Sequence, residues 1–240
     1  MLKRALVGVA TLAFGSKPAL HRVPFGPLRG RQLCNSPQIS LRMLLGMDEE
    51  WVTDIIRREL TSDAVAFDVG AHIGYTTVAM AGTGATVHAF ELHPATAALL
   101  ECTANANRDL AIHVHPVGLG CARGQIRLPL GETYMTAIRS ENGEGALCTI
   151  ETMDAYREQE ALPLPDFVKI DVEMAEIDCL NGARETLRHR PPLLIEFHTG
   201  KLLTEGLALL RDMGYTHFVC EHPEAMAKVR GFCASVICRA

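Results

Sequence analysis

The feature that most constrains the fold is a repeated alternation between short apolar runs and segments with helical spacing. The apolar runs at residues 64–69, 86–90, 166–170 and 193–197 are followed by predicted helices at 75–81, 94–107, 175–189 and 201–213. Further strands are expected at 111–117, 125–130, 215–220 and 234–238. Strands that alternate with helices predict an α/β fold with a mostly parallel sheet. Such sheets bind ligands at the carboxyl ends of their strands, so functional residues should follow each run directly.

The first 45 residues have a different character. Four prolines interrupt this stretch, which also carries basic residues and no acid before Asp48. We therefore expect an N-terminal extension over 1–45 and a folded domain over 46–240 that begins with a helix at 48–60. The extension is predicted to act as a lid or as a contact to the substrate, with an anionic membrane surface, a disordered tail and a targeting remnant as alternatives. Its first residues favour an amphipathic helix over a signal peptide.

Charge and cysteine content exclude several classes of function. The chain holds 23 Lys and Arg against 28 Asp and Glu, a net charge of −5, without a run of basic residues, which argues against nucleic-acid binding. No apolar run is long enough for a transmembrane helix, so a cytoplasmic location is expected, with contact to a membrane surface left open. None of the 8 cysteines forms a Cys-x-x-Cys pair, which indicates reduced thiols and not a zinc site or a disulfide framework.

The residues at the carboxyl ends of the first two predicted strands indicate a nucleoside-binding site. Asp68 is followed by Gly70 and Gly74, which allow a tight turn and a close approach of a ligand, and Glu91 ends the next strand. An acid about 20 residues beyond a glycine loop commonly accepts ribose hydroxyls. The loop lacks the G-x-G-x-x-G spacing of dinucleotide sites, and a carboxylate such as Asp68 suits a cationic ligand better than a pyrophosphate. S-adenosylmethionine is therefore favoured over NAD.

The exits of two later strands carry ionisable side chains that could do chemistry. Asp171 and Glu173 follow the run at 166–170, and Glu196 and His198 follow the next one. These groups could deprotonate a substrate hydroxyl, or they could hold a cation such as Mg²⁺. A buried ion pair for Glu196 and a capping or exposed position for His198 are the structural alternatives. We assign no dedicated metal ligand from the sequence, and a divalent metal is left open.

Together these segments resemble one family, the FkbM family of S-adenosylmethionine-dependent methyltransferases. The resemblance extends over residues 23–220. It implies the class I methyltransferase fold, a Rossmann-like, mostly parallel sheet of seven strands with the last one antiparallel, with 46–240 as the methyltransferase domain. It also implies methyl transfer to a hydroxyl of a sugar, glycolipid or natural product. The segments that carry it are VPFGPLRGRQL (23–33), DVGAHIGY (68–75), FELHP (90–94), TMDAY (152–156), KIDVEMAE (169–176) and IEFH (195–198).

The resemblance also implies a role for each site residue. Glu91 would hold the ribose, the turn at 118–119 would lie near the adenine, and Asp171 would lie beside the transferred methyl group. The catalytic candidates are Asp171, Glu173 and His198. The cofactor-binding candidates are Asp68, Gly70, His72, Gly74, Glu91, Gly118 and Leu119.

Two departures from the family pattern stand out. His72 replaces the usual Asn, and Met174 replaces a Gly, where a bulky side chain could narrow the acceptor pocket. The expected partner is a small molecule or glycan with a free hydroxyl. An NAD-dependent oxidoreductase and a non-catalytic nucleoside-binding protein are the alternatives, and the acceptor and the oligomeric state stay open.

Overall fold

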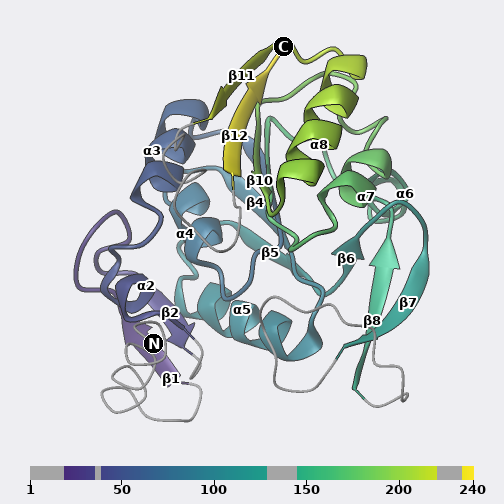
Figure 1. Cartoon of the computed structure of the whole chain (residues 1–240). Helices are drawn as coiled ribbons and strands as arrows, with labels where there is room; N and C mark the ends of the chain where they lie inside the picture. Colours follow the sequence, from purple (N-terminus) through teal and green to yellow (C-terminus); the bar gives the residue numbers. More distant parts are fainter. Residues whose placement is uncertain (1–18, 36–38, 129–144, 221–233) are drawn as a thin grey trace.

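The computed structural model describes residues 19–35, 39–128, 145–220 and 234–240 (Figure 1). Its centre is a seven-stranded sheet in the order β11-β12-β10-β9-β3-β4-β5. Five neighbouring strands are joined by parallel pairings: β3 (Val65–Val69), β4 (Thr86–Phe90), β5 (Ile112–His115), β9 (Phe167–Ile170) and β10 (Leu193–Phe197). The last strand, β12 (Ala234–Arg239), lies antiparallel between β10 and β11 (His217–Cys220). The predicted sheet of seven strands with an antiparallel last strand is confirmed.

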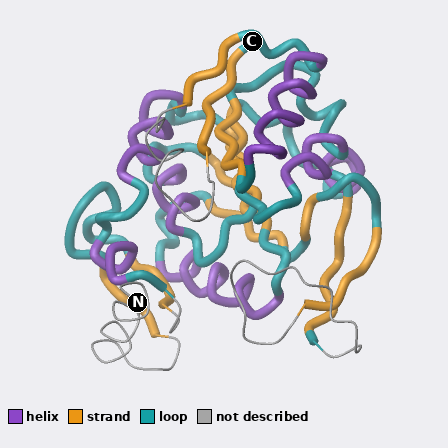
Figure 2. The backbone as a smooth tube through the Cα atoms, viewed as in Figure 1, coloured by secondary structure: helices purple, strands orange, loops and turns teal. Residues whose placement is uncertain are grey.

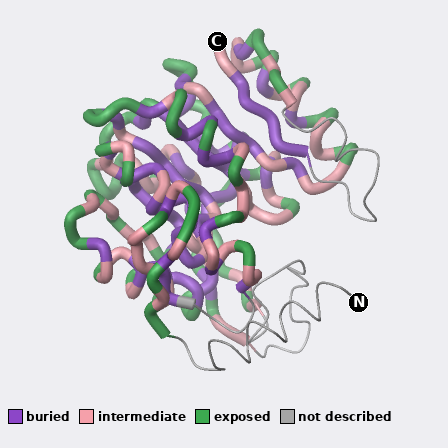
Figure 3. The backbone as a smooth tube through the Cα atoms, turned by 90° about the vertical axis from the view of Figure 1, so that its left-hand side faces the viewer, coloured by how far each residue is buried: buried purple, intermediate pink, exposed green. Residues whose placement is uncertain are grey.

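Helices cover both faces of this sheet (Figure 2). One face carries α3 (Glu50–Glu59), α4 (Tyr75–Ala81) and α5 (Pro94–Ala106), and the other carries α6 (Met153–Gln159), α7 (Glu176–Asn181) and α8 (Gly200–Asp212). Figure 3 shows the buried residues gathered in the interior of the fold. The central strands are therefore buried on both sides. This explains why their sequences read as continuous apolar runs and do not alternate.

The helix expected at 175–189 is shorter than predicted. It ends at Asn181, and residues 182–189 form turns. Gly182 is the reason, because a Cβ atom at this position would lie 2.0 Å from the carbonyl oxygen of Gly120. The close approach of two backbone segments requires a glycine there, and the glycine ends the helix.

A small second sheet lies beside the large one. It has the order β6-β8-β7, with β6 (Gly118–Leu119) parallel to β8 (Ala146–Glu151) and β7 (Gly124–Leu128) antiparallel to it. The strand expected at 125–130 corresponds to β7, whereas β8 and α6 were not predicted. The sequence also predicts a polar loop over residues 131–145, which falls largely outside the described residues.

The described residues of the N-terminal part form regular secondary structure. A hairpin of β1 (Ala19–Arg22) and β2 (Gln32–Asn35) is followed by α2 (Leu41–Leu45). The hairpin packs on α5, where Asn107 Nδ2 donates to the carbonyl of Gln32 at 2.7 Å. Leu33 and Ile39 are buried in a cluster with residues of α4, so this segment is part of the domain's core. The proposed role as a lid stays a prediction, and the helix expected before residue 19 lies outside the described part.

Two expectations concern membranes and thiols. In the described residues, no helix combines the length and the apolar character needed to cross a bilayer. The seven described cysteines are free thiols: Cys34, Cys102, Cys121, Cys148, Cys179, Cys220 and Cys238.

Three histidines stack along β4 and β5. The His88 ring lies parallel to the rings of His113 and His115, with centroids 5.0 and 5.3 Å apart, and His88 Nδ1 is 3.0 Å from His115 Nε2. Burial, reinforced by the neighbouring imidazoles, lowers the pKa of His88 to about 4 and that of His115 to about 4. Both rings are therefore neutral at pH 7, and protonating either would place a charge inside the stack.

This stack predicts a loss of stability in mild acid. A histidine whose pKa is lower in the folded than in the unfolded state stabilises the fold above pH 6.5, and this contribution is lost as the pH falls from 6.5 to 4. His88→Phe keeps the stacked ring and removes one titrating group. The melting temperature of the parent should fall more between pH 7.5 and 5 than that of the variant, by about 2–4 °C. His217→Gln, which removes an exposed histidine, should keep the parent's pH dependence, and identical profiles for all three proteins would contradict the prediction.

Candidate active site

A cavity of about 540 Å³ opens at the carboxyl ends of β3, β4 and β9. This volume lies within the range of small-molecule sites, which is roughly 300–1,000 Å³. Seven of the predicted site residues line it: Gly70, His72, Glu91, Gly118, Leu119, Asp171 and Glu173. The structure thus brings together residues that are up to 103 positions apart in the chain, from Gly70 to Glu173.

The glycine loop brings its backbone up against the neighbouring strand end. Gly70 has a φ of 80°, and a Cβ atom there would lie 1.8 Å from the carbonyl oxygen of Asp171. His72 has a φ of 52°, a left-handed conformation in which His and Asn are both enriched. The replacement of Asn by His at this position is therefore compatible with the loop. Gly74 does not line the cavity; it is the N-cap of α4 with a φ of 94°.

Asp68 lies beneath the loop and does not line the cavity. Its buried carboxylate accepts hydrogen bonds from the hydroxyls of Thr76 at 2.9 Å and Thr77 at 2.6 Å, and it is 3.6 Å from the Lys169 ammonium. These contacts tie the end of β3 to the first turn of α4. Asp68 would therefore act in cofactor binding indirectly, by holding the glycine loop in position.

Glu91 presents a carboxylate whose position is fixed by two backbone groups. One oxygen accepts from the N–H of His72 and the other from the N–H of His93, each at 2.9 Å. Burial raises the pKa of Glu91, and the two backbone hydrogen bonds oppose this rise. Since a carboxylate oxygen has two lone pairs, each oxygen can still accept one further hydrogen bond from a ligand in the cavity. A pair of adjacent ribose hydroxyls matches this arrangement.

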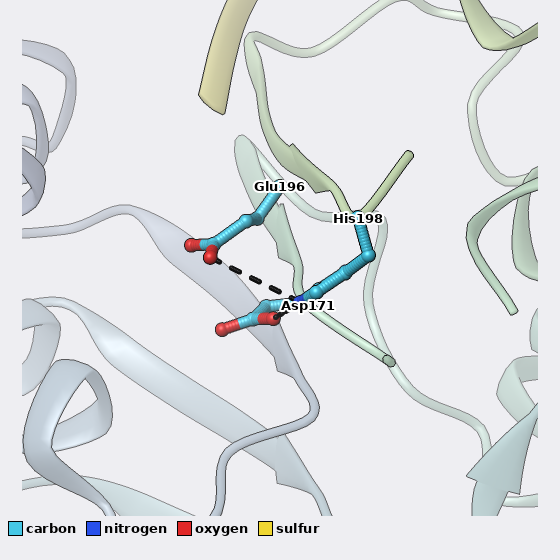
Figure 4. Close-up of side chains that lie close together, drawn as sticks. All are labelled: Asp171, Glu196 and His198. Carbon is cyan, nitrogen blue, oxygen red and sulfur yellow. Dashed lines mark ion pairs between the residues drawn. The ribbon is translucent and has the colours of Figure 1, made fainter. Parts of the chain in front are cut away.

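His198 gathers several carboxylates around its ring. Its Nδ1 is 2.7 Å from Glu176 Oε1, and its Nε2 is 3.2 Å from Glu173, 3.6 Å from Asp171 and 3.9 Å from Glu196. Figure 4 shows Asp171 and Glu196 converging on the ring. Burial lowers the pKa of His198, but the hydrogen bond that its ring donates to Glu176 and the surrounding negative charges outweigh burial and raise the pKa to about 9. The three predicted catalytic residues are therefore neighbours, and without a bound metal ion His198 is a cation at neutral pH.

Lys169 is a charged residue that the sequence analysis quoted but gave no role. Its side chain is buried, with Nζ 3.2 Å from Asp171 Oδ2 and 3.6 Å from Asp68 Oδ1. Burial lowers the pKa of Lys169, and the adjacent carboxylates, first Asp171 and then Asp68, reverse this and raise it. The sequence could have indicated this role, because Lys169 lies inside an apolar strand, and a lysine that is buried there requires charged partners.

Glu49 is a second residue that the sequence analysis missed. It precedes α3, has a left-handed backbone with a φ of 48°, and lines the cavity. Burial raises the pKa of Glu49 to about 8; Lys169 opposes this rise, and Asp171 and Glu196 add to it. In the sequence, an acidic residue before a helix is typical of an ordinary helix N-terminus, so the position of Glu49 does not indicate that it faces the charged groups of the cavity.

The turn after Asp171 contains two consecutive residues in the left-handed region. Glu173 has a φ of 48° and Met174 a φ of 81°. Met174 is 56% exposed and does not line the cavity, so its side chain does not narrow the pocket as expected. Glycine adopts this backbone without strain, which accounts for the usual Gly at this position of the family pattern.

The strain at Met174 can be measured. A left-handed backbone conformation destabilises a residue that has a side chain by about 1–2 kcal/mol, and substitution by glycine would remove this strain. Glycine also makes the unfolded chain more flexible, which favours unfolding by about 0.4–1 kcal/mol and offsets part of the gain in stability. Met174→Gly should therefore raise the free energy of unfolding by up to about 1 kcal/mol. Met174→Ala removes the same exposed side chain but keeps the Cβ atom, so it should bring no such gain in denaturant unfolding. Equal stability of the two variants would show that the backbone is not strained.

Comparison with known proteins agrees with this geometry. The Methyltransferase FkbM domain matches residues 68–216. The hexuronic acid methyltransferase AglP of Haloferax volcanii is 32% identical over 169 residues, which cover 66% of this chain and 69% of AglP.

Two solved structures share the fold. The methyltransferase FkbM of Methylobacillus flagellatus superposes with a TM-score of 0.56 at 20% identity, over 74% of this chain but only 44% of that protein. A SAM-dependent O-methyltransferase of Thermotoga maritima gives a TM-score of 0.51 at 12% identity, over 80% of this chain and 64% of that one. The class I sheet and the family are thus confirmed, and with the family comes methyl transfer from S-adenosylmethionine. The chain belongs to the FkbM methyltransferase family.

Proposed function

We propose that this protein transfers the methyl group of S-adenosylmethionine to a hydroxyl oxygen of a sugar-type acceptor. The observation that carries the proposal is one cavity that holds both Glu91, the acid suited to a ribose, and the carboxylates of Asp171 and Glu173 after β9. The relative AglP is named for a hexuronic acid, which supports a sugar as the acceptor.

The residues of the cavity fit this cofactor. The backbone of Gly70 lines the cavity, and both Glu91 oxygens have acceptor capacity toward the ribose. Gly118 and Leu119 would flank the adenine, and Asp171 and Glu49 would face the positive end of the cofactor. When bound, S-adenosylmethionine supplies a methyl group on a sulfonium, which is already electrophilic.

The charge of the site favours a hydroxyl over a carboxylate as the methyl acceptor. A hexuronic acid offers both kinds of oxygen. Asp171, Glu173 and Glu196 all face the region next to His198, whereas Lys169 is shared between Asp68 and Asp171. An acceptor carboxylate would be repelled there, but a neutral hydroxyl would not.

A hydroxyl acceptor must lose a proton during the transfer. The O–H bond breaks and a carboxylate of the protein takes the proton, the new C–O bond forms as the C–S bond breaks, and S-adenosylhomocysteine leaves. The hydrogen-bonding partners of His198 and Asp171 are already set, since His198 Nδ1 faces Glu176 and one Asp171 oxygen accepts from Lys169. We assign this role to Glu49, which lines the cavity, and give Asp171 the role of facing the sulfonium. A cationic cofactor would lower the pKa of Glu49 and make it available as a base.

The extension contributes to the acceptor end of this site. Met43 of the extension lines the cavity, and residues 19–35 and 39–45 are anchored to the domain by buried apolar side chains. This supports a role of the segment in shaping the acceptor pocket, and it argues for a fixed wall more than for a lid that opens. The exclusion of nucleic acid as an acceptor stays a prediction; the acidic groups of the cavity support it.

The ribose contact gives the first test. Glu91→Ala removes two acceptors of the cofactor and leaves two backbone N–H groups unpaired, which costs about 1–3 kcal/mol. Binding of S-adenosylhomocysteine, measured by calorimetry, should weaken about 10- to 100-fold. Glu101→Ala, on the exposed side of α5, is the control and should bind like the parent. Unchanged affinity of Glu91→Ala would refute the ribose contact.

The proton acceptor gives the second test. Glu49→Gln keeps the shape of the side chain and removes its basicity, so kcat should fall about 100-fold or more while the affinity for S-adenosylhomocysteine changes less than about threefold. Glu50→Gln, at the neighbouring exposed position, is the matched control. A parallel loss of turnover and cofactor affinity would make Glu49 a cofactor contact, and full turnover would place the base elsewhere.

A further inference from the structure

Three side chains at the ends of β9 and β10 converge as metal ligands do. Asp171, Glu196 and His198 each offer one ligand atom, and these atoms all lie within 4.8 Å of one another (Figure 4). His198 Nε2 is 3.6 Å from Asp171 Oδ1 and 3.9 Å from Glu196 Oε1. Ligands of an octahedral Mg²⁺ lie about 2.1 Å from the ion, and hence roughly 3–4 Å from one another. The observed separations are long for hydrogen bonds but match a shared ion.

The second observation lies behind His198. Its Nδ1 is 2.7 Å from Glu176 Oε1, and Glu176 is fully buried. The same oxygen accepts the backbone N–H of Met174 at 3.0 Å, so the carboxylate is held in place. A metal-binding histidine commonly donates its other ring nitrogen to a carboxylate in this way, which fixes the ring and directs the free nitrogen at the ion. The outer contact that a metal site needs is therefore present.

The two oxygens of Asp171 have separate partners. Oδ2 accepts from the Lys169 ammonium at 3.2 Å, and Oδ1 faces His198. Lys169 thus does not block the oxygen that points to the cluster. Glu173 adds a further carboxylate oxygen 3.2 Å from His198 Nε2. Around this point the fixed charges of the protein are mostly negative, which favours a bound cation.

We propose that Asp171, Glu196 and His198 form a binding site for one divalent cation of the Mg²⁺ and Mn²⁺ class. The carboxylate oxygens select a hard ion, and three protein ligands leave positions for water and for an oxygen of the acceptor. If the proposed methyl transfer is correct, on which this role rests, the ion would polarise the acceptor hydroxyl and ease the loss of its proton. The competing arrangement has no metal, with a protonated His198 as the cation among the carboxylates.

Mn²⁺ is the probe that tests the site directly. The full chain, stripped with EDTA and dialysed, is titrated with MnCl₂, and bound ion is measured by the loss of the paramagnetic resonance signal of free Mn²⁺. We expect one ion per chain, displaced by excess Mg²⁺. Absence of binding at millimolar Mn²⁺ would overturn the proposal and favour the protonated histidine.

Variants show where the ion binds. Asp171→Asn and Glu196→Gln should each weaken Mn²⁺ binding at least about tenfold, and Glu176→Gln about 10- to 100-fold through the orientation of His198. Glu205→Gln, at an exposed ion pair on α8, is the control and should bind like the parent. If the folded ligand variants bind Mn²⁺ as tightly as the parent, the ion lies elsewhere and the proposal is wrong. If they do not fold, the stoichiometry of the parent and the Glu176→Gln result decide.

The same samples separate this proposal from the proposed function. Binding of S-adenosylhomocysteine is measured beside Mn²⁺ binding. Cofactor binding without Mn²⁺ binding would refute only the metal site, and Mn²⁺ binding without cofactor binding would refute only the methyl-transfer function. Labelled methyl transfer that falls at least about tenfold after chelation and returns with Mg²⁺ would support the catalytic role of the ion.

Discussion

The site depends on one buried cation. Lys169 lies opposite Asp68 in the parallel pairing of β9 with β3, and its ammonium lies between Asp68 and Asp171. Asp68 is joined in turn to α4 through two threonine hydroxyls. A buried charge is tolerated only when it is paired, so each of the three side chains fixes the other two. The glycine loop and the turn after β9 are thereby held at a constant distance from each other.

This pairing divides the site into two electrostatic halves. Below the loop, the charge of Asp68 is compensated by Lys169, so Asp68 does not exclude a pyrophosphate as directly as its sequence position suggests. Beyond Asp171, however, the carboxylates of Glu173 and Glu196 exceed the positive charge available from His198. The preference for a cationic ligand thus comes from the ends of β9 and β10. A sulfonium and a divalent cation could both be drawn to this half.

The sequence predicted the part of the site that follows strand ends, because a parallel sheet places these positions on one edge. Glu91, Asp171 and Glu173 were found in this way. Glu49 was not, because its contact with the end of β9 spans more than 120 residues and no local pattern encodes it. The hairpin β1–β2 was missed for a related reason: its short strands are stabilised by packing on α5 and not by a periodic pattern of their own.

The turn between β9 and α7 shows how the outer contacts of the site are built. Two successive left-handed residues reverse the chain, which costs conformational free energy at Glu173 and Met174. The reversal brings the Met174 N–H to Glu176 and lets the same carboxylate oxygen reach His198. Glu176 therefore couples the shape of this turn to the orientation of the histidine at the end of β10. A chain with glycine at position 174 would make the same turn with less strain. The residue at this position therefore affects the backbone conformation of the turn, and through Glu176 it affects the geometry of the charged cluster.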